Sequence, residues 1–119
     1  MSDTPVIDLQ AIEVLRSLNP DDNGEFLKEI VGIFLEDTPQ RIAELDQSLA
    51  SSDLARFTRA AHSIKGSSAN MGAVLLRSAA EKLEHHSKAN GLADCEVLVK
   101  AVKSEFERAA KEIRVIADF

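Results

Sequence analysis

The sequence predicts an all-α protein, an antiparallel up-down-up-down four-helix bundle with one short extra helix at the N-terminus. Apolar residues recur at helical spacing in several consecutive segments. Five Gly and three Pro in 119 residues are too few for a turn-rich β architecture. The connections between the longer segments are short, as between antiparallel helices. The length fits a single domain over residues 1–119, and 45% hydrophobic residues suffice for one core.

The first two helical segments are separated by a strong chain break. Apolar residues three positions apart predict a short helix over about residues 8–18: Ile12, Leu15 and Leu18. Asp8 is placed to cap its N-terminus. The sequence NPDDNG then interrupts the pattern. A second apolar stripe keeps its phase across Pro39, so we expect one kinked helix over about residues 25–50.

Three further helices are predicted in the rest of the chain, over about residues 53–71, 73–89 and 92–117. The first follows the start signal ASSD, in which Ser51 or Ser52 is the expected N-cap and Asp53 lies in the first turn. Gly72 is expected just beyond the C-terminus of this helix, where glycine is the common residue. Gly91, in the pair Asn-Gly, ends the next helix.

The charge and composition exclude several classes of function. The formal net charge is −6 and the isoelectric point is near 5.0, which argues against binding to nucleic acid or to anionic membranes. We see no positively charged apolar leader and no apolar run of about 18 residues, so neither a signal peptide nor a membrane span is expected. The single Cys95 fits a reducing compartment. These features predict a cytoplasmic protein, most simply a monomer.

One histidine points away from the predicted core. At about 100° per residue, the apolar face of the 53–71 helix consists of Leu54, Phe57, Ala61, Ile64, Ser68 and Met71. His62 lies far around the helix from that face. Arg59 and Lys65 flank it at i−3 and i+3. Small residues lie one or two turns away on its own side: Ala55, Thr58, Gly66 and Ala69.

Two features of this segment suggest that an anionic group approaches His62. A glycine inside a helix costs about 1 kcal/mol relative to alanine, so Gly66 is best explained by a partner that needs the space. Residues 54–80 contain no Asp or Glu, although the chain holds 20. We interpret this as negative charge cleared from around the histidine. A neutral imidazole is a competent nucleophile near neutral pH, and an ammonium such as Lys65 can stabilise a phosphoryl group.

The stretch AHSIKGSSANMGA over residues 61–73 resembles the phosphoacceptor signature of histidine-containing phosphotransfer (HPt) domains, His-x-x-Lys-Gly followed by small residues and Gly-Ala. The helix order and the stretch FLEDTPQRIAEL are also similar to this family. The resemblance implies that His62 takes a phosphoryl group on Nε2 from a receiver-domain aspartate, often that of a hybrid sensor kinase. It then passes the group to a response-regulator receiver, within a two-component phosphorelay. It implies that Lys65 neutralises the phosphoryl charge, that Gly66 admits the receiver and that Gly72 turns the chain.

The resemblance also suggests how partners would dock. Receivers would bind the histidine-bearing helix, beside Thr58, Arg59 and Ala69, and the helix before it. Ile33 and Asp37 are the docking candidates there, although Ile33 could instead pack under the N-terminal helix. Any Mg²⁺ would belong to the receiver, and we expect no intrinsic cofactor or metal.

Three other functions are alternatives to phosphotransfer. A di-iron bundle needs inward Glu-x-x-His pairs, and the residues three before the three histidines are Arg59, Lys82 and Leu83. An autokinase needs a nucleotide-binding glycine loop, and the glycines of this chain are not spaced as one. A non-catalytic helical adaptor that binds receiver domains stays open, because only His62 itself argues against it.

Overall fold

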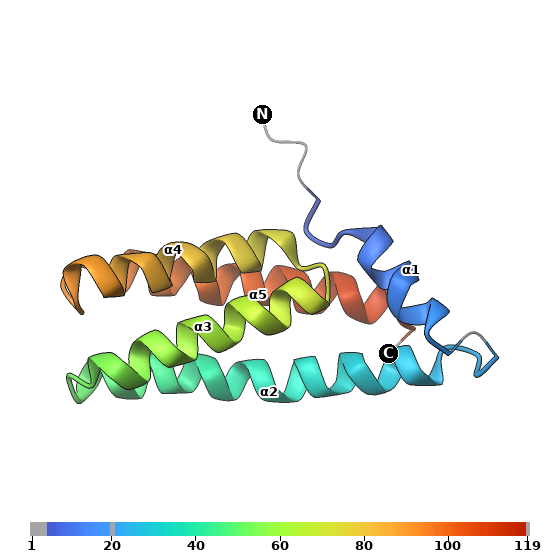
Figure 1. Ribbon diagram of the computed structural model, residues 1–119, viewed down its shortest axis with the longest axis horizontal. Coiled ribbons are helices and arrows are strands. Elements are labelled where there is room, and N and C mark those ends of the chain that lie inside the picture. The colour runs from blue at the N-terminus through green and yellow to red at the C-terminus, as the bar shows by residue number, and fades with distance from the viewer. Residues whose placement is uncertain (1–4, 20, 119) are drawn as a thin grey trace.

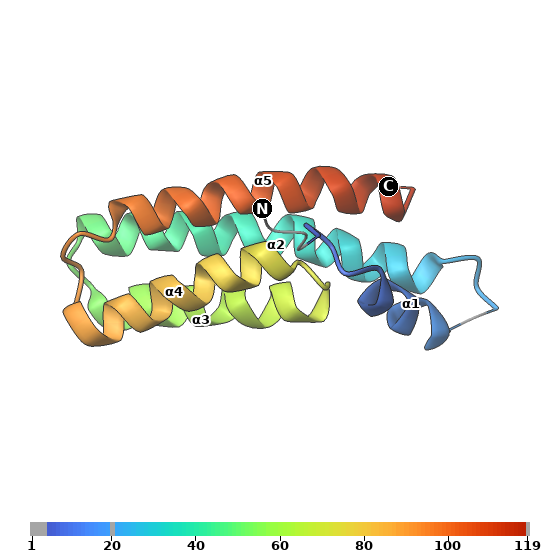
Figure 2. The same ribbon diagram turned by 90° about the horizontal axis from the view of Figure 1, so that it is seen from above.

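The computed structural model describes residues 5–19 and 21–118. These residues form five helices and no strand: α1 (Leu9–Ser17), α2 (Glu25–Ala50), α3 (Leu54–Asn70), α4 (Val74–Asn90) and α5 (Glu96–Ile116). Helices α2 to α5 run antiparallel in chain order and close into a four-helix bundle, in which α5 returns beside α2 (Figures 1 and 2). Helix α1 crosses the end of the bundle where α2 begins and α5 ends. The all-α four-helix bundle predicted from the sequence is confirmed.

The core is mainly aliphatic and draws on all five helices. Phe34 and Phe106 add the one aromatic pair found among the described residues, with ring centroids 5.7 Å apart. The largest fully buried apolar side chains are Phe57, Ile12, Leu27, Leu45, Ile64, Met71, Leu76, Leu83, Ile113, Val31 and Val102. Burying each such side chain contributes about 1.5–3 kcal/mol to folding relative to leaving it exposed. The core therefore holds the helices, and the residues on their outer faces, in place.

Helix α2 continues through its proline, as the unbroken apolar phase predicts. Pro39 lies on the exposed side of the helix, next to the fully buried Thr38. Buried residues appear both before and after this point, including Phe34 and Leu45. Because packing on the buried face fixes the helix on both sides of the proline, the loss of one backbone hydrogen bond does not end it.

The turn between α3 and α4 depends on Gly72. Its φ of +69° is left-handed, which a glycine adopts without steric cost. Its carbonyl accepts a 2.7 Å hydrogen bond from the backbone N–H of Asp8, at the start of α1. A Cβ at this position would lie 2.7 Å from the Ala11 side chain and 2.9 Å from the Asp8 carbonyl oxygen. Gly72 therefore shapes the turn and also lets α1 pack against it.

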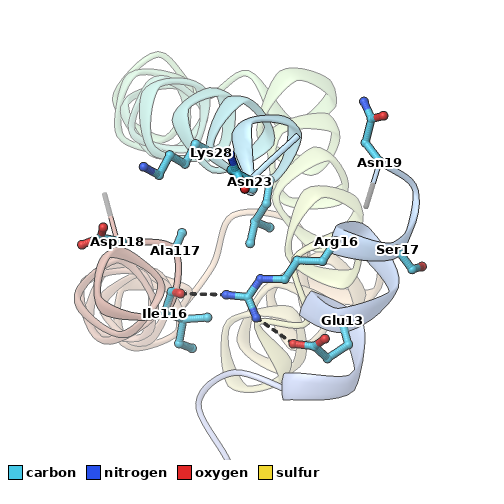
Figure 3. Close-up of a pocket in the computed structure, with 11 residues that line it drawn as sticks. Glu13, Arg16, Ser17, Asn19, Asn23, Lys28, Ile116, Ala117 and Asp118 are labelled. Carbon is cyan, nitrogen blue, oxygen red and sulfur yellow. Dashed lines mark hydrogen bonds and ion pairs between the residues drawn. The ribbon is translucent and has the colours of Figure 1, made fainter. Parts of the chain in front are cut away.

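The far end of α1 is held by Arg16. Its guanidinium donates to the Ile116 carbonyl at 3.0 Å and pairs with Glu13 at 2.7 Å, beside a pocket of about 510 Å³ (Figure 3). A cation at the last carbonyls of α5 also interacts favourably with the helix dipole. Arg16 thus ties α1 to the C-terminus of the bundle.

Three local predictions are wrong. Asp53, not Ser51 or Ser52, is the N-cap of α3, because its carboxylate accepts from the backbone N–H of Arg56 at 3.1 Å. Leu54 follows this cap and is 42% exposed, so it is not part of the core face. The last helix begins at Glu96 rather than at residue 92, because the left-handed φ angles of Gly91 and Asp94 (+68° and +56°) prevent an earlier start.

None of the helices within the described residues has the length and apolar character needed to cross a membrane.

Candidate functional site

His62 stands on the outer surface of α3, as the helical periodicity predicts. Its side chain is 65% exposed, whereas Ala61 and Ile64 on the opposite face are fully buried. The core packing of α3 holds the backbone beneath the ring, while the imidazole itself can be reached from solvent.

The imidazole is held by a buried carboxylate from the next helix. Glu84 of α4 is only 2% exposed, and its Oε2 lies 2.9 Å from Nδ1 of His62. No spacing along the sequence predicts this contact. The interpretation that negative charge is cleared from around the histidine is wrong, because the acid-free window ends at residue 80 and the carboxylate arrives from the facing helix. Only the packing of α3 against α4 brings the two residues together.

Two lysines compensate the charge of this carboxylate. Lys65 Nζ lies 2.7 Å from Oε1 of Glu84, and Lys88 Nζ lies 3.1 Å from Oε2. Burial alone would raise the pKa of Glu84, but hydrogen bonds from Lys65, Lys88 and His62 outweigh it and lower the pKa from 4.5 to about 2. Glu84 is therefore an anion throughout the physiological pH range.

An ionised Glu84 determines which imidazole nitrogen carries the proton. A carboxylate can only accept a hydrogen bond, so Nδ1 of His62 is the donor in the 2.9 Å contact. In the neutral ring, Nε2 then keeps its lone pair. The arrangement thus presents a fixed tautomer with an unprotonated nitrogen available for nucleophilic attack.

A shallow depression of about 640 Å³ lies beside the ring, between α3 and α4. It is lined by Leu54, Ala55, Thr58, Arg59, His62, Glu84, Ser87 and Lys88. The hydroxyls of Thr58 and Ser87 are hydrogen-bonded to each other at 2.8 Å, and Ser87 also donates to the Glu84 carbonyl. Thr58 is therefore engaged in joining α3 to α4 next to the site.

The other predicted docking residues are exposed or half-buried on α3 and α2. Gly66, Arg59 and Ala69 are exposed on α3, and no atom lies within 4 Å of the position that a Cβ on Gly66 would take. Nothing in the fold therefore requires a glycine there. Ile33 is 58% exposed, so the alternative that it packs under α1 is wrong. Asp37, one turn further along α2, is half-buried and pairs with Arg41 at 3.8 Å.

The remaining histidines and the cysteine lie apart from this cluster. His85 is exposed, and Nε2 of His86 bonds to the Ala93 carbonyl at 2.6 Å near the end of α4. Cys95 is fully buried, as expected of a small core residue, and this burial raises the pKa of its thiol. Across residues 5–19 and 21–118, no three His, Cys, Asp or Glu side chains converge as metal ligands would.

A helical bundle that exposes a tautomer-fixed histidine, bonded to a carboxylate that two lysines also contact, is suited to carrying a transferable anionic group. The family model that matches the sequence is that of the Hpt domain, over residues 29–112. The chain belongs to the Hpt domain family, and this membership supports a function in two-component phosphotransfer.

Two curated relatives agree with this assignment. The chain is 27% identical over 119 residues to Multistep phosphorelay regulator 1 of Schizosaccharomyces pombe, a match that covers all of this chain and 40% of the yeast protein. It is 27% identical over 109 residues to Histidine-containing phosphotransfer protein 4 of Arabidopsis thaliana, covering 90% of this chain and 85% of the plant protein. The chain thus spans less than half the length of the yeast regulator.

Solved structures show the same architecture. Histidine-containing phosphotransfer protein B from Pseudomonas aeruginosa superposes with a TM-score of 0.86 at 26% identity, over 98% of this chain and 97% of that one. The maize phosphotransfer protein ZmHP2 gives a TM-score of 0.83 at 21% identity, over 99% and 87% of the two chains, and is a likeness of fold.

Proposed function

We propose that His62 is the phosphoacceptor of a phosphorelay, receiving a phosphoryl group from a receiver-domain aspartate and passing it to the receiver of a response regulator. The observation that carries this proposal is the exposed imidazole whose Nδ1 is bonded to the ionised Glu84. In the forward step the Nε2 lone pair attacks phosphorus, the N–P bond forms, and the electron pair of the broken P–O bond returns to the partner's carboxylate. The reverse sequence delivers the group to the next aspartate.

In this proposal the chain positions the imidazole and supplies positive charge, and the phosphoryl group comes from the partner's aspartate rather than from a bound nucleotide. Glu84 keeps the proton on Nδ1, so Nε2 can attack without a prior proton transfer. Lys65 supplies positive charge beside the ring, although Glu84 shares it. We assign Mg²⁺ to the partner's carboxylates, since phosphoryl transfer between carboxylate and imidazole needs the metal where the aspartate lies. The protein would act as a carrier without autokinase activity.

Because the ring is exposed, the surface of the partner must cover it during the transfer. Gly66 and Ala69 leave space beside His62 on α3, and Ile33 on α2 offers an exposed apolar side chain. Arg59 adds a cation facing an acidic receiver site. These features support docking of one receiver at a time on a monomeric carrier.

The test is phosphotransfer from labelled receivers to three proteins. The wild type and His85→Gln, which replaces an exposed histidine outside the cluster, should take up the label, and His62→Gln should not. Equal labelling of His62→Gln would exclude His62 as the acceptor. Binding of a phosphorylated receiver with no labelling of the wild type would favour the adaptor function instead.

A further inference from the structure

We infer that a pocket lined by three arginines, between α2 and α3, binds a carboxylate side chain of the docked receiver. This carboxylate lies outside the receiver's phosphorylation site, and Arg59 is the residue that pairs with it. The inference rests on the proposed phosphotransfer between His62 and receivers. It adds a contact that distinguishes receivers by the charge of their docking surface.

The arginine pocket lies beside the phosphoacceptor, where α3 faces α2. It has a volume of about 310 Å³ and is lined by Arg41 and Glu44 of α2 and by Arg56, Arg59, Ala60 and Ser63 of α3. Ser63 directly follows His62 in the chain. The depression that Glu84 lines is between α3 and α4 instead. The pocket is therefore separate from the carboxylate that holds the imidazole, and Arg59 borders both hollows.

Positive charge exceeds negative charge in the arginine pocket. Three guanidinium groups face the single carboxylate of Glu44, which leaves two positive charges in excess. One remains when Asp37, which pairs with Arg41 at 3.8 Å, is also counted. The whole chain, by contrast, has a formal net charge of −6. A local excess of positive charge favours an anionic group, and the small volume fits a side chain better than a cofactor.

Arg59 is the cation of the pocket that can bind a partner. Glu44 holds the other two arginines, because its Oε1 lies 2.6 Å from a guanidinium nitrogen of Arg41 and its Oε2 lies 3.3 Å from Nε of Arg56. Arg56 also donates to the side chain of Gln47 at 2.8 Å. Arg59 is exposed, and in the part of the chain that the structure describes it forms no ion pair and no side-chain hydrogen bond. Its N–H donors are therefore available to a group from another molecule.

One side of α2 connects the arginine pocket with the rest of the proposed docking surface. Ile33, Asp37 and Arg41 follow one another at intervals of four residues, so they lie along the same side of the helix. This row runs from the exposed side chain of Ile33 to the pocket. A receiver that covers both Ile33 and His62 spans the boundary between α2 and α3, where the pocket lies. The group on the receiver that matches the planar guanidinium is a carboxylate.

The inference is tested with the receiver that labels the wild type most rapidly. Its dissociation constant is measured by calorimetry for the wild type, Arg59→Gln, Arg59→Glu, Arg59→Lys and the control Arg114→Gln, an exposed arginine of α5 outside the pocket. Arg59→Gln should weaken binding about fivefold, and Arg59→Glu should weaken it more than about tenfold. Arg59→Lys should keep part of the affinity, because it keeps the charge without the planar group. Arg114→Gln should match the wild type.

Two further measurements identify the contact as an ion pair with the receiver. Each exposed Asp or Glu around the receiver's phosphorylation site is replaced in turn by lysine, and one of these variants should bind Arg59→Glu about tenfold more tightly than the unmodified receiver does. Raising the salt concentration from about 0.1 M to 1 M shortens the screening length from about 10 Å to 3 Å. This change should remove most of the difference in affinity between the wild type and Arg59→Gln.

The outcomes separate this inference from the proposed function. Equal receiver affinity of the wild type and Arg59→Gln, or a loss in Arg59→Glu that no lysine on the receiver restores, would overturn the inference while His62 still accepts label. Binding of inorganic phosphate that depends on Arg59, with no effect on the receiver, would also overturn it and assign the pocket to a free anion. If no receiver labels the wild type, the proposed function fails and the inference fails with it. Because Arg59 is exposed, each variant should keep the melting temperature of the wild type.

Discussion

Replacing Glu84 by glutamine should remove a pH-dependent part of the protein's stability. The side chain is 2% exposed, and its pKa is lowered from 4.5 to about 2 by the hydrogen bonds of Lys65, Lys88 and His62, against the opposing effect of burial. Each tenfold change in proton affinity corresponds to about 1.4 kcal/mol. The ionised carboxylate therefore contributes roughly 3 kcal/mol to the free energy of unfolding at neutral pH.

The sign of the pH dependence follows from the lowered pKa. The unfolded state binds a proton more readily than the folded state, so the contribution is fully present above pH 4.5 and is lost as pH falls towards about 2. Between pH 5 and pH 3 the loss amounts to about 2 kcal/mol.

The assay is urea unfolding followed by circular dichroism at pH 5, 4 and 3. The wild type should be more stable than Glu84→Gln at pH 5, and the difference should shrink by about 2 kcal/mol at pH 3. Glu107→Gln, an exposed carboxylate of α5, is the control and should stay close to the wild type throughout. A difference between wild type and Glu84→Gln that does not change with pH would refute the account of Glu84 as a stabilised anion.

Substitutions at four further positions test the site and its support. Gly66→Ala should raise the free energy of unfolding by up to about 1 kcal/mol, since a Cβ at this position meets no atom within 4 Å. Gly66→Gln should fold but bind receivers more weakly, and an unchanged receiver affinity in that variant would show that the glycine has no role in docking. Gly72→Ala should lower stability by about 1–2 kcal/mol through its left-handed φ alone, with more from the contact with α1; an unchanged melting temperature would contradict this. Lys65→Ala should slow phosphotransfer and also destabilise the protein by about 1–3 kcal/mol, because it takes one partner from Glu84; wild-type values of both would refute its role. Asp53→Ala should cost about 1 kcal/mol as a lost N-cap, and no change in urea midpoint would argue against that cap.

Local features of the site could be predicted because they depend on one helix at a time. The exposure of His62 and the burial of Ile64 follow from 3.6 residues per turn, which the order of residues determines. The turn at Gly72 follows from its position at the end of a periodic segment. The predicted start of α5 is wrong because Asp94 adopts a left-handed φ of +56° although it is not a glycine. No apolar pattern in the sequence indicates this conformation.

The sequence by itself determined the helical bundle, the outward imidazole and the motif around it, since each is a matter of spacing along one segment. Only the tertiary structure decided that Glu84, with its neighbour Lys88 one turn further along α4, meets His62. That contact depends on the register in which α3 packs on α4. This register brings Nδ1 of His62 to 2.9 Å from Oε2 of Glu84, a residue 22 positions further along the chain. Register between helices is fixed by how many buried side chains fit together at once, and no single segment contains that information.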